Sequence, residues 1–345
     1  MKFSGSHNEW DEVQEIVVGS AKGAIRSRIG LDQKAIEYAK VDNLDESELG
    51  TFSKCTIEET EEDLEVLVSE LKKLKINVKR PAEIDQSIEF ATQDWKTDGF
   101  YNYCPRDSLL VVGEKIIEAP MTMRSRFLEQ FAYKDMMIDY MKEGAQWFSA
   151  PKPRLLDSAY NLKKGELGLN NLEPIFDAAN VLRAGNDLFY LVSSTGNELG
   201  ALWLQTVLGS EYKVNLCRNM YDGIHIDSTI VLLRPGLVLL NPERINENNL
   251  PEKLKKWDKI WCPELKDNGG NAKYLLSSIW VGMNIFMVSP NLAIVDSTQT
   301  ELIKLLNQNK IDVLPLRLRH SRELGGGFHC VTLDIKRKSK LENYF

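Results

Sequence analysis

The segment TIVLLRPGLVLLNPE, residues 229–243, consists of two apolar runs joined by a Pro-Gly pair. Short apolar runs bounded by turn residues are typical of buried β-strands, and a Pro-Gly pair favours a tight turn. The segment therefore predicts a β-hairpin whose turn lies at Gly236. Three other segments have the same form, with turns at Gly113, Gly185 and Pro290: LLVVGEKIIEAP (109–120), NVLRAGNDLFYLVS (180–193) and NIFMVSPNLAIVDS (284–297).

Helical patterns alternate with these hairpins. In DLEVLVSELKKL (63–74), apolar residues recur at the i, i+3, i+4, i+7 spacing of an amphipathic helix. Similar patterns predict helices over residues 124–141, 197–208 and 300–308. Such alternation indicates an α/β protein.

The ends of the chain carry two further apolar runs, EIVVGS (15–20) and HCVTLDI (329–335), which we expect to pair as strands. Strand pairs and helices that recur at similar intervals predict a closed ring of similar units around a central axis, as in propellers. We expect one domain that spans residues 1–345. The charge-rich stretch from about 245 to 273 is expected to form a long surface excursion between two units.

Composition limits the classes of function. The chain has 345 residues, 43% hydrophobic and 27% charged, which is typical of a globular protein. Its net charge of −7 and the absence of a long basic run argue against a nucleic-acid partner. No apolar stretch is long enough for a signal peptide or a membrane span, so we expect a cytoplasmic protein. Five cysteines without a CxxC pair, and four histidines without ligand spacing, predict free thiols and no metal or cofactor.

The stretch LGGGFHC, residues 324–330, places three glycines directly before a histidine and Cys330. Glycine runs suit unusual backbone dihedrals or a close approach to the backbone. The run is either an ordinary turn beside a buried, unreactive cysteine or a loop that presents the Cys330 sulfur to a ligand. His329 is a poor base for that sulfur, because adjacent residues of a strand point to opposite faces.

Acidic residues and a histidine open two of the hairpins. Asp177 lies in EPIFDAAN, and His225 and Asp227, two residues apart, are expected to share one face of a strand. Asp177 could instead cap a turn, and His225 could be a satisfied core histidine. Together with Cys330 these groups suit a cationic electrophile: thiolate attacks carbon, imidazole moves protons and carboxylates bind the cation. A guanidinium is the biological cation whose centre is carbon.

Seven motifs along the chain resemble, in order, the amidinotransferases that act on glycine and on inosamine phosphates. They are CPRDSLLVVGEKIIEAPMTMRSRFLE (104–129), APKPRL (150–155), EPIFDAANVLRAG (173–185), HIDST (225–229), LNPER (240–244), SSIWVGMN (277–284) and GGGFHCVTLDIKR (325–337). The resemblance begins near residue 8 and covers nearly the whole chain. It implies the pentein fold, a fivefold pseudosymmetric α/β propeller of ββαβ units.

The resemblance also implies a ping-pong reaction. Cys330 would attack the guanidinium carbon of L-arginine, ornithine would leave, and an acceptor amine would take the amidino group from sulfur. His225 would act as general acid and base, and Asp177 would orient it. We further hypothesise that the bound guanidinium promotes ionisation of the Cys330 thiol.

Other positions would bind substrates by the same resemblance. Asp107 and Asp227 would clamp the guanidinium by bidentate hydrogen bonds. Arg244 and Ser278 would receive the carboxylate of the donor.

Two departures from the family pattern concern the acceptor. Asn180 stands where the glycine-using enzyme has an aspartate. The residues before His225, which vary with the acceptor in relatives, are Asp222, Gly223 and Ile224. Asp222 would favour an acceptor with a second positive charge and oppose a phosphorylated one, although Asp222-Gly223 could equally be an exposed turn.

A guanidine hydrolase or deiminase of the same fold is the main alternative, with water in place of the amine. A non-catalytic pentein binding factor is the other, but it would have no need for this set of side chains. The partners implied are small molecules, with no membrane, and a homodimer is compatible with the family. Glycine, lysine, an aminocyclitol or its phosphate, or an amine of a toxin pathway all remain open as acceptor, and a secondary-metabolite acceptor is favoured at least as much as glycine.

Overall fold

The computed structural model describes residues 3–41, 43–45, 51–269 and 273–345. Within these residues the chain forms five three-stranded sheets and one two-stranded sheet. Every three-stranded sheet has the same construction. An antiparallel strand pair is followed by a helical segment and by a third strand, which runs parallel to the second strand of the pair.

Four of the antiparallel pairs are the hairpins that the sequence predicts. These four are β5 (Leu109–Val112) with β6 (Lys115–Glu118), β8 (Val181–Ala184) with β9 (Asp187–Leu191), β11 (Ile230–Arg234) with β12 (Leu237–Leu240), and β14 (Phe286–Ser289) with β15 (Leu292–Asp296). The fifth pair joins β17 (Thr332–Arg337) to β1 (Val13–Val18). Gly113, Gly185 and Gly236 turn their hairpins with φ of 55°, 68° and 80°. Glycine adopts this left-handed region without the steric cost that a side chain adds.

The helical segments and third strands complete the units. The third strands are β2 (Asn77–Lys79), β7 (Gln146–Ser149), β10 (Lys213–Cys217), β13 (Asp258–Trp261) and β16 (Asp312–Leu316). The helical segments that precede them are α2 (Lys54–Lys73), α4 (Lys134–Lys142), α5 (Glu198–Leu208), the 3-10 helix η7 (Glu252–Lys256) and α6 (Thr300–Gln308). These third strands have half-exposed, partly polar residues, and their pattern did not separate them from loops.

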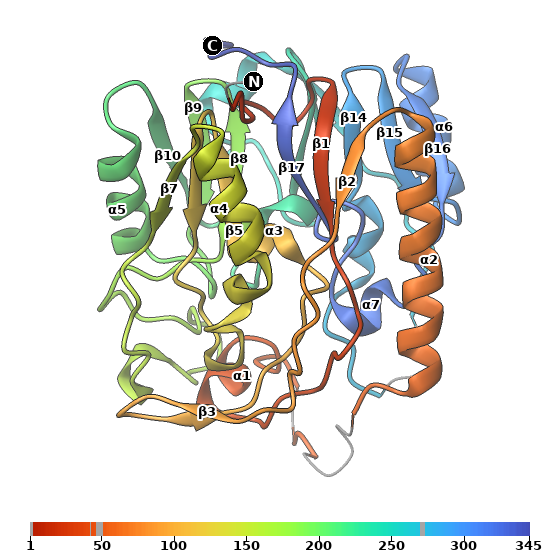
Figure 1. The fold of residues 1–345 in the computed structure, drawn as a ribbon. Coiled ribbons are helices and arrows are strands. Elements are labelled where there is room, and N and C mark those ends of the chain that lie inside the picture. Colours follow the sequence, from red (N-terminus) through yellow and green to blue (C-terminus); the bar gives the residue numbers. More distant parts are fainter. Residues whose placement is uncertain (1–2, 42, 46–50, 270–272) are drawn as a thin grey trace.

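The first unit is assembled from both ends of the chain. In Figure 1, β1 and β17 lie side by side and the two termini lie at the same end of the molecule. The predicted pairing of the two terminal strands is therefore confirmed. It closes the ring of units, because the last strand of the chain begins the sheet that β1 and β2 continue.

Two sequence predictions are wrong in part. Residues 124–141 do not form one helix: 3-10 turns η2 (Arg124–Arg126) and η3 (Glu129–Tyr133) precede α4. Arg126 and Glu129 turn inward to pair with each other, which breaks the amphipathic pattern there. The stretch from 245 to 273 is not merely a surface excursion, because among its described residues it carries η7 and β13.

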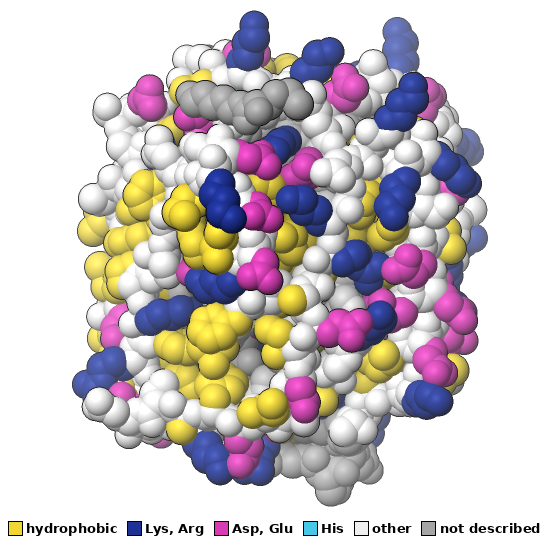
Figure 2. All heavy atoms as spheres, viewed as in Figure 1, with side chains coloured by type: hydrophobic (Ala, Val, Ile, Leu, Met, Phe, Trp, Pro, Cys, Tyr) yellow, Lys and Arg dark blue, Asp and Glu magenta, His cyan; other side chains and the backbone are white. Residues whose placement is uncertain are grey.

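Apolar clusters fill the space between neighbouring units. Leu64, Leu67, Val68 and Leu71 of α2 are buried, as their spacing predicts, and Ser53 caps this helix by accepting a hydrogen bond from the backbone N–H of Thr56. Lysine, arginine, aspartate and glutamate side chains are intermixed over the face shown in Figure 2. No helix in the described part of the chain is long and apolar enough to cross a membrane.

Shorter elements lie outside the repeated units. They are α1 (Leu31–Ala35), the two-stranded sheet of β3 (Phe90–Ala91) and β4 (Lys96–Thr97), α3 (Pro105–Ser108), η4 (Asp157–Ala159), η5 (Ala178–Asn180), η6 (Ile226–Ser228), η8 (Ile279–Met283) and α7 (Ser321–Leu324). Several of these turns lead directly into the first strand of a sheet and carry the polar residues considered next.

Candidate active site

A short turn precedes the first strand of each three-stranded sheet. The turns are α3 before β5, η5 before β8, η6 before β11, η8 before β14, and residues 328–331 before β17. Successive turns contact one another, α3 with η5, η5 with η6 and η6 with η8. The repeated unit therefore brings side chains that are far apart in sequence to one place.

The local conformation at two of these turns differs from the sequence prediction. His225 and Asp227 do not lie on one strand, because His225 is the N-cap of the 3-10 turn η6, which contains Asp227. Asp177 likewise is the N-cap of η5, but its side chain makes no capping hydrogen bond. The carboxylate of Asp177 is therefore free to act in the pocket rather than at the helix end.

A pocket of about 660 Å³, including its part open to solvent, lies where the turns meet. Seven of the nine predicted site residues line it: Asp107, Asp177, Ile224, His225, Asp227, Ser278 and Cys330. The other two lie outside the lining. Arg244 lies behind Ser278, and Asp222 is exposed, with its carbonyl accepting hydrogen bonds from Ser194.

His225 lies between two carboxylates. Its Nε2 is 3.1 Å from Asp177 Oδ2 and its Nδ1 is 3.5 Å from Asp107 Oδ1. The other Asp177 oxygen accepts hydrogen bonds from the backbone N–H and the hydroxyl of Thr122, at 2.9 and 2.8 Å. Burial opposes the charged imidazolium, but the charge of Asp107 and the hydrogen bond to Asp177 prevail and raise the pKa of His225 well above its usual value. His225 can therefore deliver a proton at neutral pH.

Cys330 is buried, and its thiol donates to Asp227 Oδ2 at 3.3 Å. A hydrogen bond with Cys104, burial and the negative charge of Asp227 raise the pKa of the Cys330 thiol well above its usual value, and the contact with His225 offsets only part of this. In the pocket without substrate, the sulfur is therefore held as a thiol.

The three glycines before Cys330 are needed by the geometry of the loop. Gly325 has φ 80°, in the left-handed region. A Cβ on Gly326 would lie 2.6 Å from Cys104 Sγ, and one on Gly327 would lie 2.7 Å from Asn284 Cβ. The glycines thus let the backbone pass close to two neighbouring side chains, and the loop brings Cys330 into the pocket.

Asn284 holds the main chain at Cys330. Its Oδ1 accepts hydrogen bonds from the backbone N–H groups of His329 and Cys330, both at 3.0 Å. Asn284 also lines the pocket, and its side chain helps to lower the pKa of Asp227. Asn284 ends the motif SSIWVGMN, but an asparagine carries no signal of this contact in sequence.

Asp107 presents an unsatisfied oxygen to the pocket. Arg126 Nη1 donates to Asp107 Oδ2 at 2.8 Å, and the same guanidinium binds Glu129 with two further hydrogen bonds of 2.8 Å. Asp107 Oδ1 is buried and lies 3.5 Å from His225 Nδ1, but it accepts no hydrogen bond from the described residues. A buried carboxylate oxygen without a donor is costly, so this oxygen fits a ligand rich in N–H groups.

Arg244 and Ser278 form a second polar wall. Arg244 Nη2 donates to Ser278 Oγ at 3.2 Å, and Nη1 donates to the hydroxyls of Ser228 and Thr229 at 2.9 and 3.0 Å. The guanidinium lies over the ring of Tyr221, 3.6 Å from its centroid. These contacts fix a positive charge beside the pocket, where it suits an anionic group of a ligand.

His329 contacts the site through Asp227, a contact that the sequence does not indicate. Its ring nitrogens face Asp227 and Glu9, residues that are separated from it by 102 and 320 positions. It therefore does not serve as a base for the sulfur, but it touches a carboxylate that does contact the sulfur. Within the described residues, no group of three His, Cys, Asp or Glu side chains is arranged to hold a metal ion.

Known proteins resemble this chain over its whole length, although no family model matches it. Inosamine-phosphate amidinotransferase 1 of Streptomyces glaucescens is 53% identical over 346 residues, which cover 100% of this chain and 99% of the relative. Mitochondrial glycine amidinotransferase of Gallus gallus is 35% identical over 99% of this chain and 84% of the relative. Both relatives match the chain far beyond the seven motifs.

Solved structures agree with the sequence comparisons. The inosamine-phosphate amidinotransferase of Streptomyces griseus superposes with a TM-score of 0.97 at 50% identity, covering 100% of this chain and 99% of that one. A dimethylarginine dimethylaminohydrolase of Pseudomonas aeruginosa, at 12% identity and a TM-score of 0.61 over 93% of this chain and 99% of that one, shares the fold. The prediction of an α/β pentein fold is thus confirmed, and the chain belongs to the amidinotransferase family, a family of transferases.

Proposed function

We propose that this enzyme moves the amidino group of L-arginine, through a covalent adduct on Cys330, to an acceptor amine and releases ornithine. One observation carries the proposal: the buried Asp107 Oδ1 without a hydrogen-bond donor lines the same pocket as Asp227 and the Cys330 thiol. Two carboxylates beside a nucleophile fit a planar cation whose carbon is attacked. Arg244 and Ser278 would bind the donor carboxylate.

The first half-reaction forms a bond from Cys330 Sγ to the guanidinium carbon and breaks the bond from that carbon to the ornithine nitrogen. The thiol proton passes to solvent through the open pocket as the sulfur ionises beside the incoming cation, and a proton from solvent restores the thiol after the product has left. His225, already an imidazolium, gives its proton to the departing nitrogen, so ornithine leaves as an amine and His225 becomes neutral. Asp177 keeps the His225 ring in place throughout.

The second half-reaction reverses these roles. The acceptor nitrogen attacks the amidino carbon, neutral His225 takes a proton from that nitrogen, and the carbon–sulfur bond breaks to restore Cys330. Because the acceptor nitrogen occupies the place that the ornithine nitrogen left, one histidine serves both steps. Water in this place would give citrulline, which is the outcome of a hydrolase.

Ionisation of Cys330 should depend on the substrate. In the free enzyme, the rate of alkylation by iodoacetamide should keep rising from about pH 7 to about pH 9, because Cys104, burial and Asp227 raise the pKa of the thiol. The measurement is the pH profile of inactivation, with Cys330→Ala to subtract alkylation elsewhere. A plateau that begins below about pH 7 would mean that the thiolate exists before substrate binds.

We propose an acceptor amine on a precursor of a secondary metabolite, and an inosamine phosphate is the first to test. The likeness to inosamine-phosphate amidinotransferases supports this choice. Asp222 is exposed and lies outside the pocket lining, and we propose that its charge does not exclude a phosphorylated acceptor. Its predicted role in acceptor choice is tested by Asp222→Asn, and unchanged relative rates for two acceptors would contradict that role.

The experiment for the whole proposal follows both products. The enzyme is incubated with arginine and, in separate reactions, with glycine, lysine, an inosamine and an inosamine phosphate, and ornithine, citrulline and guanidino products are quantified. Ornithine in equal amount to one guanidino product supports the proposal, and Cys330→Ala should give neither. Citrulline as the main product would support the hydrolase alternative instead. A homodimer, a single domain and a cytoplasmic location remain predictions.

A further inference from the structure

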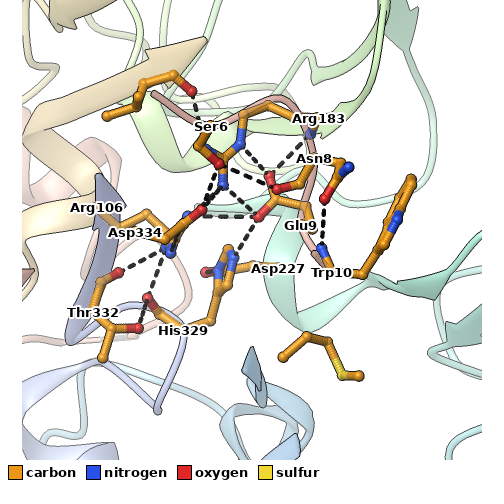
Figure 3. Close-up of polar contacts among 12 residues, drawn as sticks. Ser6, Asn8, Glu9, Trp10, Arg106, Arg183, Asp227, His329, Thr332 and Asp334 are labelled. Atoms are coloured by element: carbon orange, nitrogen blue, oxygen red, sulfur yellow. Dashed lines mark hydrogen bonds and ion pairs between the residues drawn. The ribbon is translucent and has the colours of Figure 1, made fainter. Parts of the chain in front are cut away.

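The imidazole of His329 lies between two buried carboxylates. Its Nδ1 is 2.9 Å from Asp227 Oδ2 and its Nε2 is 3.3 Å from Glu9 Oε2. Carboxylate oxygens accept hydrogen bonds, so both ring nitrogens donate only if both carry a proton. This geometry points to an imidazolium, and Figure 3 shows the His329 ring beside Asp227 and joined by a dashed line to Glu9.

Glu9 is held rigidly from its other side. Arg183 donates to Glu9 Oε1 from its backbone N–H at 3.0 Å and from Nε at 2.8 Å, and it donates to Oε2 from Nη2 at 2.8 Å. Arg183 also pairs with Asp334, which binds Arg106 and Arg337 as well (Figure 3 labels all of these except Arg337). Glu9 is therefore a fixed partner for the His329 ring.

Without His329, this cluster already carries one more positive than negative charge. Glu9 and Asp334 supply two negative charges, and Arg106, Arg183 and Arg337 supply three positive ones. A charge on His329 is therefore not needed to neutralise the cluster. The carboxylate that needs a cation is Asp227, and within the described part of the chain its ion-pair partner is His329.

Asp227 connects this charge to the reacting sulfur. The same oxygen, Oδ2, accepts from His329 Nδ1 and from the Cys330 thiol. Burial by itself would favour the neutral acid, but the hydrogen bond from His329 and its positive charge lower the pKa of Asp227 to about 2. Asp227 thus stays ionised in a buried site, with one oxygen fixed by His329.

We propose that His329 is a positioning residue, which acts through Asp227 to position the arginine donor. This role rests on the proposed use of a guanidinium substrate. The His329 imidazolium keeps Asp227 anionic and fixed while the guanidinium displaces the thiol from Oδ2. Glu9 holds the ring against movement away from the pocket. Loss of this contact weakens binding of arginine more than binding of the acceptor, since the acceptor amine is not held by Asp227.

The test compares three substitutions that retain different contacts. In His329→Asn, the side-chain amide can donate to Asp227 from the place of Nδ1. In His329→Gln, it can donate to Glu9 from the place of Nε2, and His329→Leu retains neither contact. We expect the KM for arginine to rise about 10- to 100-fold in His329→Leu and His329→Gln, and by no more than about fivefold in His329→Asn. The KM for the acceptor should stay within about threefold of the wild-type value in all three variants.

Several outcomes would overturn the proposal. An unchanged KM for arginine in His329→Leu would contradict it. A lower KM for arginine in His329→Gln than in His329→Asn would also contradict it, because it would indicate that only the contact with Glu9 matters. Equal changes in both KM values would indicate a general structural loss. If His329→Leu does not fold, the contrast between Asn and Gln decides alone.

His320 provides a matched control. It also bridges two carboxylates, with Nε2 2.6 Å from Glu59 and Nδ1 3.4 Å from Glu323, but it does not line the pocket. His320→Asn should leave both KM values unchanged. The wild-type enzyme separates the two proposals: if it releases no ornithine from arginine, the proposed function fails before the variants are compared, and if it does, only the role of His329 is at stake.

Discussion

His225→Asn is expected to lower kcat by about 10²- to 10⁴-fold, the range that general acid–base catalysis contributes. Asparagine can still donate one hydrogen bond, but it cannot give a proton to the ornithine nitrogen or take one from the acceptor. Both half-reactions should therefore slow. The pKa of His225 lies well above its usual value because Asp107 and Asp177 outweigh burial, so the acid is charged in the wild-type enzyme at neutral pH.

The measurement separates the two half-reactions. Release of ornithine in a single turnover reports the first, and discharge of a preformed adduct by the acceptor reports the second. Asp177→Asn should also lower kcat, because Thr122 holds Oδ1 and thereby turns the amide NH2 group toward His225 Nε2, where it cannot accept a hydrogen bond from the imidazolium. Loss of only one half-reaction in His225→Asn would show that another group moves the proton in the other step.

Asp334→Asn is expected to destabilise the protein by about 3–5 kcal/mol, the range for breaking a buried ion pair on one side. Asp334 is fully buried and pairs with Arg106, Arg183 and Arg337. Its removal leaves Glu9 as the only carboxylate of the cluster for these three cations. Urea unfolding of both proteins, with the free energy extrapolated to water, measures the difference.

A surface pair is the control for this effect. Glu166 pairs with Lys163 at exposed positions, so Glu166→Gln should leave the free energy of unfolding nearly unchanged. A loss below about 1 kcal/mol in Asp334→Asn would mean that the buried cluster does not hold the units together.

The same cluster sets how the protein responds to acid. Burial would raise the pKa of Asp334, but the charges of Arg183, Arg337 and Arg106 lower it well below its usual value. A group with a lowered folded pKa contributes stability that is complete above its unfolded pKa, about 4, and is lost as the pH falls toward the folded pKa. The wild-type free energy of unfolding should therefore fall below about pH 4, and Asp334→Asn should show a shallower fall.

The hairpins and the close approach of the glycine loop before Cys330 could be predicted from the sequence, for physical reasons. Two apolar runs around Gly113, Gly185 or Gly236 have few alternatives to a hairpin, because the turn needs a left-handed residue. The glycines before Cys330 likewise signal a close approach that the structure shows at Cys104 and Asn284. The motifs then indicate the family, which the comparisons confirm.

The contacts between different units of the ring could not be predicted from the sequence. Asn284 binds the backbone of Cys330 from 46 residues away, and Glu9 binds His329 across 320 residues. Neither spacing leaves a local pattern, because the contacts follow from the ring and not from any one segment. The third strands are short and half-exposed, so their sequences do not distinguish them from loops. The turn that holds His225 gives no helical signal either, because a single 3-10 turn has no periodicity.

The central claim is that Cys330 carries the amidino group between arginine and the acceptor. The most direct test is the intact mass of the enzyme after incubation with arginine alone. The account predicts a gain equal to one amidino group, located on Cys330 by peptide mapping, absent in Cys330→Ala and discharged when an acceptor amine is added. An unmodified mass together with steady production of citrulline, or an adduct that persists in Cys330→Ala, would contradict it.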